Sequence, residues 1–200
     1  FAQIGPFNFP SMVPFWFAPY ALATGNTYVI KPSPQTPLSQ TRMMELVQQA
    51  GFPSGVINLV HGGAEQAEAL VTHSLVRGIS FVGTTRVARR IYELAGLHGK
   101  RVQAQGGAMN HLVIMPDANL DAVIPNLMGS TFGCAGQRCL AGSVVVAQDD
   151  IYAEFRERLG SAAGSMRLGD GLDPVVDMGP VISADAQTHI ISAIDEASAS

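Results

Sequence analysis

The sequence predicts an α/β fold built on a parallel sheet. Short β-rich segments alternate with amphipathic helical segments along the first half of the chain, at the spacing of βαβ units. Of the 200 residues, 47% are hydrophobic and only 14% are charged, so the chain can bury a real core. A glycine pair, Gly106-Gly107, then breaks the alternation. We therefore expect two domains, residues 1–105 and residues 106–200.

The first domain is expected to open with a proline-stiffened loop at 4–10, followed by a buried helix over 11–23. The expected strands are 27–30, 56–60, 76–82 and 101–105, and the further helices are 38–50, 64–72 and 85–95. In the helix at 38–50 the apolar face is formed by Met43, Leu46, Val47 and Ala50. Ligands of such a sheet bind at the carboxyl ends of its strands.

The second domain is expected to contain strands at 112–115 and 143–147 and helices at 120–128 and 151–165. A loop rich in glycine and aspartate, 169–180, precedes a last helix that begins near Ala184. The chain begins with Phe1 and stops inside a helical pattern. We interpret it as a fragment of a longer protein, whose other parts contribute to the site.

Composition argues against several function classes. The net charge is −4 and no basic run exists, which disfavours nucleic-acid binding. The richest apolar run, 12–23, is interrupted by Pro14 and Pro19, so no membrane span is expected. The five histidines show no metal-ligand spacing, and we expect no metal. Two cysteines are too few for a disulfide scaffold and indicate a reducing compartment such as the cytoplasm.

The stretch 132–139 holds both cysteines and carries the strongest chemical signal. Small residues precede Cys139, and the cation Arg138 adjoins it, a setting that favours a reactive thiolate. The alternative is that Cys139 is a small buried hydrophobic residue, as most such cysteines are. Cys134 is expected to pack. No carboxylate lies between Asp121 and Asp149, so this segment supplies no general base.

Three further residues each allow two interpretations. Lys31 follows a strand and is either a cation for a ribose or phosphate or a solvated loop lysine. Thr84 or Thr85 can cap a helix, and the helix N-terminus with Thr84 either helps to bind an anion or is only capped. Asn8, between two prolines, either donates to an oxyanion or is an ordinary turn asparagine. A G-x-G-x-x-G fingerprint is absent.

Taken together, these segments resemble the NAD-dependent aldehyde dehydrogenase superfamily over nearly the whole chain. The matching motifs are Pro6-Phe7-Asn8-Phe9-Pro10, Lys31-Pro32-Ser33, Phe81-Val82-Gly83-Thr84, Gly106-Gly107, Gly136-Gln137-Arg138-Cys139 and Asp177-Met178-Gly179-Pro180. Asn58-Leu59-Val60-His61-Gly62, Asn110-His111 and Met115-Pro116-Asp117-Ala118-Asn119 are most similar to its CoA-acylating methylmalonate-semialdehyde dehydrogenases.

The resemblance implies an NAD-binding domain at 1–105 and the start of a catalytic domain at 106–200. Cys139 would be the nucleophile, and Asn8 with the Cys139 N–H would form the oxyanion hole. Arg138 would bind the carboxylate of a semialdehyde. The implied cofactor-binding residues are Gly5, Phe7, Lys31, Pro34, Gln35, Thr84 and Gly106.

Three positions depart from the wider pattern. Gln105 stands where hydrolytic relatives carry a glutamate that activates water, and an amide cannot act as a general base. This favours acyl transfer to CoA. Pro34 replaces a usual ribose-binding glutamate, which puts cofactor affinity in question. Met109 replaces a usual lysine, and the sequence offers no interpretation of this replacement.

The resemblance thus implies oxidation of malonate or methylmalonate semialdehyde to acetyl- or propionyl-CoA, with NAD and CoA, as in valine catabolism. It also implies a homotetramer in the cytoplasm, or in the mitochondrial matrix if the source is eukaryotic. The alternatives are a hydrolytic aldehyde dehydrogenase and a non-catalytic remnant that only binds nucleotide.

Overall fold

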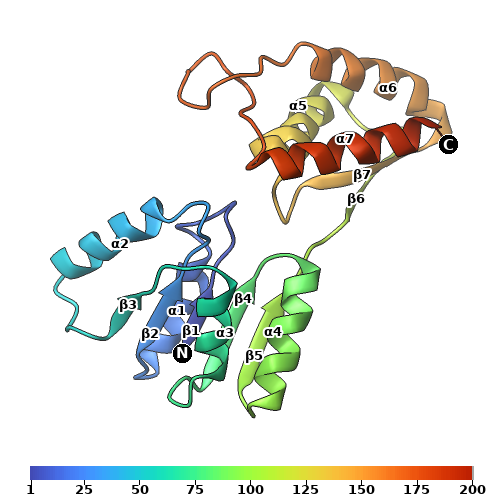
Figure 1. The fold of residues 1–200 in the computed structure, drawn as a ribbon. Helices are drawn as coiled ribbons and strands as arrows, with labels where there is room; N and C mark the ends of the chain where they lie inside the picture. The colour runs from blue at the N-terminus through green and yellow to red at the C-terminus, as the bar shows by residue number, and fades with distance from the viewer. Residues whose placement is uncertain (200) are drawn as a thin grey trace. The chain divides into compact units, whose positions relative to one another are not determined.

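The computed structural model describes residues 1–199 and divides into two compact units, Phe1–Gly107 and the part of the chain from Ala108 onward. Figure 1 shows each unit as a sheet with its helices. Both units are α/β, as the sequence predicts. No helix within residues 1–199 combines the length and the apolar character needed to cross a membrane.

The first unit is built on a five-stranded, wholly parallel sheet with the order β3-β2-β1-β4-β5. Its strands are β1 (Ala2–Ile4), β2 (Tyr28–Lys31), β3 (Ile57–Leu59), β4 (Gly78–Val82) and β5 (Arg101–Gln105). The central strand, β1, was not predicted, because three residues are too few to show a period of two. All three of its residues are buried between β2 and β4.

Helices cover both faces of this sheet (Figure 1). On one face, α3 (Ala64–Thr72) and α4 (Thr85–Leu97) pack their buried residues against Ala2, Ile4, Ile79 and Phe81. On the other face, α1 (Pro14–Ala23) packs Ala18 and Ala21 against Tyr28 and Ile30. Such a doubly wound sheet leaves its carboxyl edge for the ligand.

Two details of the predicted helices are wrong. The helix expected over 11–23 begins at Pro14 and is only partly buried, since Tyr20 is 77% exposed. In α2 (Leu38–Gln49), Leu46 and Ala50 of the predicted apolar face are exposed, and the buried residue is Gln40. Hydrophobic periodicity located both helices but did not show how much of each is covered.

The second unit contains a two-stranded parallel sheet of β6 (Asn110–Ile114) and β7 (Gly142–Ala147). Their register shifts at one end: Asn110 pairs with Gly142, but His111 pairs with Val144. The core joins Ile114 to buried residues of α5 (Leu120–Phe132) and α6 (Asp149–Gly164). A short helix, η1 (Gly133–Gly136), follows α5, and α7 (Ala184–Ala199) ends the described chain.

Candidate active site

The carboxyl edge of the first unit's sheet gathers all the predicted cofactor residues. The chain runs outward from β1 to β2 and β3, then returns to β4 on the other side of β1, so the topological switch point lies between β1 and β4. The predicted residues are Gly5 and Phe7 after β1, Lys31, Pro34 and Gln35 at and after β2, Thr84 after β4, and Gly106 after β5.

Lys31 is buried at this edge, with 3% of its surface exposed. Its Nζ donates to the carbonyl oxygens of Pro32 at 2.9 Å and of Gly62 at 2.7 Å. Burial lowers the pKa of the Lys31 ammonium, because both partners are neutral and do not offset the loss of water. The alternative of a solvated loop lysine is therefore wrong, and the Lys31 side chain is held at a fixed place.

The loops after β1 and β2 support one another. The Gly5 N–H donates to the Lys31 carbonyl at 2.9 Å, and the Thr36 hydroxyl donates to the Phe7 carbonyl at 3.2 Å. Buried Gln40 in α2 donates its Nε2 to the Pro10 carbonyl at 2.5 Å. These bonds fix the loop that carries Asn8 on both sides of that residue. Pro34 and Gln35 are exposed at the turn that follows β2.

A hydrogen bond also joins the segments that follow β4 and β5. Thr84 caps α4, as predicted, with its Oγ1 accepting a long hydrogen bond of 3.5 Å from the Val87 N–H. The Gly107 N–H donates to the Thr85 Oγ1 at 3.0 Å. A Cβ on Gly106 would lie 3.1 Å from the Thr85 Cα, so a larger residue there would require Thr85 to move by a few tenths of an ångström.

Cys139 lies in the second unit, in a turn where the Ala141 N–H donates to the Arg138 carbonyl at 3.3 Å. The backbone before it is strained: Cys134 and Ala135 both have a φ of 53°, a region that favours glycine. Cys139 is half-buried, and within residues 1–199 no hydrogen bond uses its N–H. Cys134 is exposed, so the expectation that it packs is wrong.

Arg138 turns its side chain back over the end of α5. Its Nη1 donates to the Gly129 carbonyl at 3.1 Å, and a Cβ on Gly133 would lie 2.7 Å from the same atom. One of the five guanidinium N–H groups is thereby used, and the others can bind an anion. A side chain at Gly133 would require the end of the Arg138 side chain to move.

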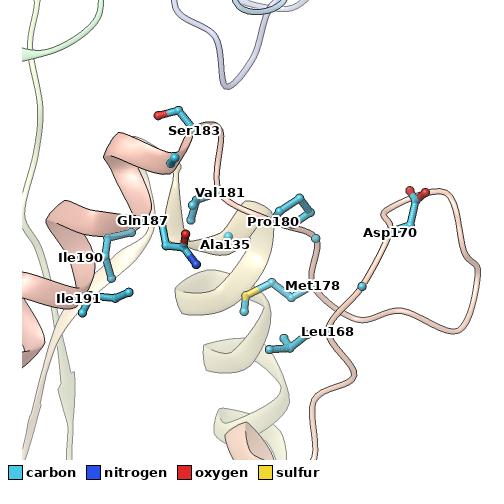
Figure 2. Close-up of a pocket in the computed structure, with 13 residues that line it drawn as sticks. Ala135, Leu168, Asp170, Met178, Pro180, Val181, Ser183, Gln187, Ile190 and Ile191 are labelled. Carbon is cyan, nitrogen blue, oxygen red and sulfur yellow. The ribbon is translucent and has the colours of Figure 1, made fainter.

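A pocket of about 960 Å³ adjoins the cysteine loop at Ala135 (Figure 2). It lies between α7 and the segment 168–183. The bidentate ion pair of Arg167 and Asp177 closes the first part of that segment, residues 168–176, into a loop. The sequence did not predict this pocket, although the glycine- and aspartate-rich loop marks one of its walls. Its main apolar lining residues are Leu168, Met178, Pro180, Val181, Ile190 and Ile191.

A doubly wound sheet with cationic and glycine-bearing loops at its carboxyl edge defines a nucleotide-binding type of α/β protein. The thiol on a constrained turn in the second unit adds a candidate for covalent catalysis. The chain belongs to the aldehyde dehydrogenase family, whose model matches residues 1–200. The resemblance to this family that the motifs indicated is confirmed.

Two curated relatives of this chain are named for malonate semialdehyde. Malonate-semialdehyde dehydrogenase 1 of Oceanobacillus iheyensis is 47% identical over 194 residues, 97% of this chain and 40% of that protein. Malonate-semialdehyde dehydrogenase 2 of Geobacillus kaustophilus is 49% identical over 179 residues, 90% of this chain and 37% of that protein. The chain thus spans about 40% of the length of its curated relatives.

Solved structures agree with this fold. The methylmalonate-semialdehyde dehydrogenase of Oceanimonas doudoroffii superimposes with a TM-score of 0.95 at 42% identity, covering 98% of this chain and 41% of that one. A point variant of betaine aldehyde dehydrogenase from Staphylococcus aureus, solved with NAD⁺, gives 0.94 at 34% identity, covering 99% and 40%. The predicted α/β fold with an aldehyde dehydrogenase-like parallel sheet is confirmed.

Proposed function

We propose that the full-length protein is an NAD-dependent, CoA-acylating malonate- or methylmalonate-semialdehyde dehydrogenase. Relatives named for malonate semialdehyde match nearly the whole chain at 44–49% identity. One observation supports the CoA step: the exposed residue at the carboxyl end of β5 is the amide Gln105, where hydrolytic members of the family carry a carboxylate. An amide cannot deprotonate water.

The carboxyl edge of the first unit fits NAD. Lys31 supplies a fixed positive charge beside the turn of Pro34 and Gln35, which would hold the adenosine ribose. The N-terminus of α4, capped by Thr84, offers backbone N–H groups to a pyrophosphate. Gly5 and Phe7 would line the cleft, and Gly106 would face the nicotinamide end. NAD, when bound, accepts the two electrons and hydrogen of a hydride.

Cys139 and Asn8 would carry the first chemical step. The Cys139 thiolate, after its proton has passed to solvent, forms a carbon–sulfur bond to the aldehyde carbon. The electron pair of the carbonyl π bond moves to oxygen, where the Asn8 amide and the free Cys139 N–H stabilise the oxyanion. When that pair returns, the carbon loses hydride, and the substrate is left as a thioester on Cys139.

Acyl transfer and decarboxylation complete the proposed reaction. The bond between the β-carboxylate and the α-carbon breaks, carbon dioxide leaves, and the electron pair on the α-carbon takes up a solvent proton. The thiolate of CoA then attacks the thioester carbon, and Cys139 leaves as thiolate. Arg138 would hold the substrate carboxylate before the C–C bond breaks. Family resemblance also supports a homotetramer in the cytoplasm, or in the matrix of mitochondria.

The test is to assay the full-length protein with malonate and methylmalonate semialdehydes, with and without CoA. We expect NADH formation to require CoA and to yield acetyl- or propionyl-CoA. Cys139→Ala should abolish NADH formation, whereas Cys134→Ala, at an exposed position, should retain it. Activity in Cys139→Ala would refute the mechanism. Free acid formed at full rate without CoA would instead identify a hydrolytic enzyme.

A further inference from the structure

Asn110, the first residue of β6, is bonded directly to the backbone of Cys139. Its Nδ2 donates to the Cys139 carbonyl at 2.8 Å and to the Ala141 carbonyl at 2.9 Å. The two acceptors lie on either side of Leu140 in the turn, and both bonds are partly buried. An amide nitrogen has two N–H groups, so both are used on this one turn.

This contact comes from a distant part of the chain and does not follow from the turn itself. The turn has one internal backbone bond, from the Ala141 N–H to the Arg138 carbonyl at 3.3 Å. That bond is long, and the residues before it include the strained Cys134 and Ala135. The Asn110 side chain therefore supplies the two shortest hydrogen bonds that hold the backbone of Cys139 and Ala141.

We propose that Asn110 is a positioning residue for the nucleophile. The inference rests on the proposed function, because it assumes that Cys139 reacts. By holding the carbonyl of Cys139 and the carbonyl two residues later, Asn110 fixes the peptide planes on the C-terminal side of Cys139. The bond from the Ala141 N–H to the Arg138 carbonyl holds the plane before Cys139, which contains the Cys139 N–H. With the planes on both sides held, the direction of the Cys139 side chain is restricted. A nucleophile held in one orientation reacts faster than one on a mobile turn.

The two cysteines provide an internal comparison for the test. Cys134 lies in the same loop but on the other side of Gln137, and its carbonyl is held by Gln137 and not by Asn110. The experiment measures the rates at which iodoacetamide alkylates Cys139 and Cys134 in the full-length protein, by peptide mass spectrometry. Loosening of the whole unit would raise or lower both rates, whereas loss of positioning changes the Cys139 rate alone.

We expect Asn110→Ala to lower the Cys139 rate by about tenfold, the effect of losing hydrogen bonds of this kind, with the Cys134 rate unchanged. NAD affinity, which depends on the first unit, should also be unchanged. The matched control is Asn126→Ala, since Asn126 donates to the Ala122 carbonyl at 2.8 Å on the exposed side of α5. That variant should keep both rates.

An unchanged ratio of the Cys139 and Cys134 rates in Asn110→Ala would overturn the proposal. If that variant does not fold, Asn110→Ser keeps one donor and should give a smaller fall in the Cys139 rate, and an unchanged ratio there would overturn it equally. If Cys139 in the unaltered protein reacts no faster than Cys134, the proposed function itself fails, and this inference fails with it.

Discussion

The Oε1 of Gln137 accepts a hydrogen bond from the backbone N–H of Ile182, 3.0 Å away and 45 residues later in the chain. The Nε2 of the same amide donates to the Cys134 carbonyl at 3.1 Å. One side chain therefore joins the cysteine loop to the segment that leads into α7. Gln137 lies in the family motif Gly136 to Cys139, and Ile182 follows the motif Asp177 to Pro180 by two residues.

Gln137→Leu should destabilise the second unit, because the partly buried N–H of Ile182 loses its acceptor. We expect a loss of about 1–3 kcal/mol in the free energy of unfolding, measured by urea denaturation of the full-length protein. Gln148→Leu is the control, since Gln148 is exposed and its side chain makes no cap to α6. Equal stability of the two variants would show that the contact with Ile182 is energetically neutral.

Gln105→Glu should give the enzyme a hydrolytic reaction. The new carboxylate, at the exposed end of β5, can deprotonate water, and a well-placed general base contributes about a hundredfold or more. We expect free acid to form without CoA at least about tenfold faster than in the unaltered protein. Gln103→Glu, two residues earlier on the same face of β5, is the matched control. Equal acid formation by both variants would place the acyl thioester away from Gln105.

Arg138→Ala should raise KM for malonate semialdehyde by about tenfold or more, because a charged hydrogen bond to the substrate carboxylate is lost. KM for an aldehyde without a carboxylate, such as propanal, should change little. Arg156→Ala removes an exposed arginine from α6 and serves as the control. A parallel rise of KM for both aldehydes would mean that Arg138 only supports the loop through its bond to Gly129.

The Arg167–Asp177 ion pair should make the free energy of unfolding of the second unit depend on pH in acidic solution. Hydrogen bonds from the Arg167 guanidinium and N–H lower the pKa of the Asp177 carboxyl. The ionised Asp177 carboxylate therefore stabilises the folded state at pH values above the pKa of about 3.9 that it has in the unfolded chain. This stabilisation is lost as the pH falls through the lower pKa that Asp177 has in the folded state.

Asp177→Asn should consequently be less stable than the unaltered protein at neutral pH, with a difference that shrinks as pH falls toward 3. Urea denaturation at several pH values measures this difference. Asp173→Asn, in the same loop, tests whether any aspartate there has the same effect, since Asp173 accepts a bond from the Val175 N–H. A difference that stays constant with pH would contradict the assignment to the carboxylate charge.

The sequence predicted most helices and strands closely, because hydrophobic residues recur with different periods in strands and in helices. The helix at 64–72 and the strand at 101–105 have their predicted bounds. The features that the sequence did not predict depend on contacts between distant parts of the chain. Lys31 is buried because the distant Gly62 carbonyl accepts from it, and no local pattern marks that partner. Cys134 and Ala135 have a left-handed backbone, which is usually found at glycine, so the sequence did not predict it.

The candidate site was located by family motifs more than by chemistry. Gly5, Lys31, Thr84 and Gly106 are far apart in the chain, and only the strand order brings them to one edge. The roles of Cys139 and Arg138 stay predictions until the variants above are measured, and the role of Asn8 also stays a prediction. The contribution of Asn110 could not be read from the sequence, because its two acceptors are backbone carbonyls about thirty residues away, which any residue type provides.

The shifted register where β6 meets β7 separates the turn that carries Cys139 from the rest of strand β7. Ser143 is the extra residue between the partners of Asn110 and His111. Extra residues of this kind re-aim neighbouring side chains, and a slip by one residue turns a strand's side chains to the opposite face. Because the extra residue lies beyond Gly142, the pair of Asn110 and Gly142 stays on the Cys139 side of the irregularity. A change of length at Ser143 therefore re-aims the later residues of β7 and leaves Asn110 beside the turn that carries Cys139.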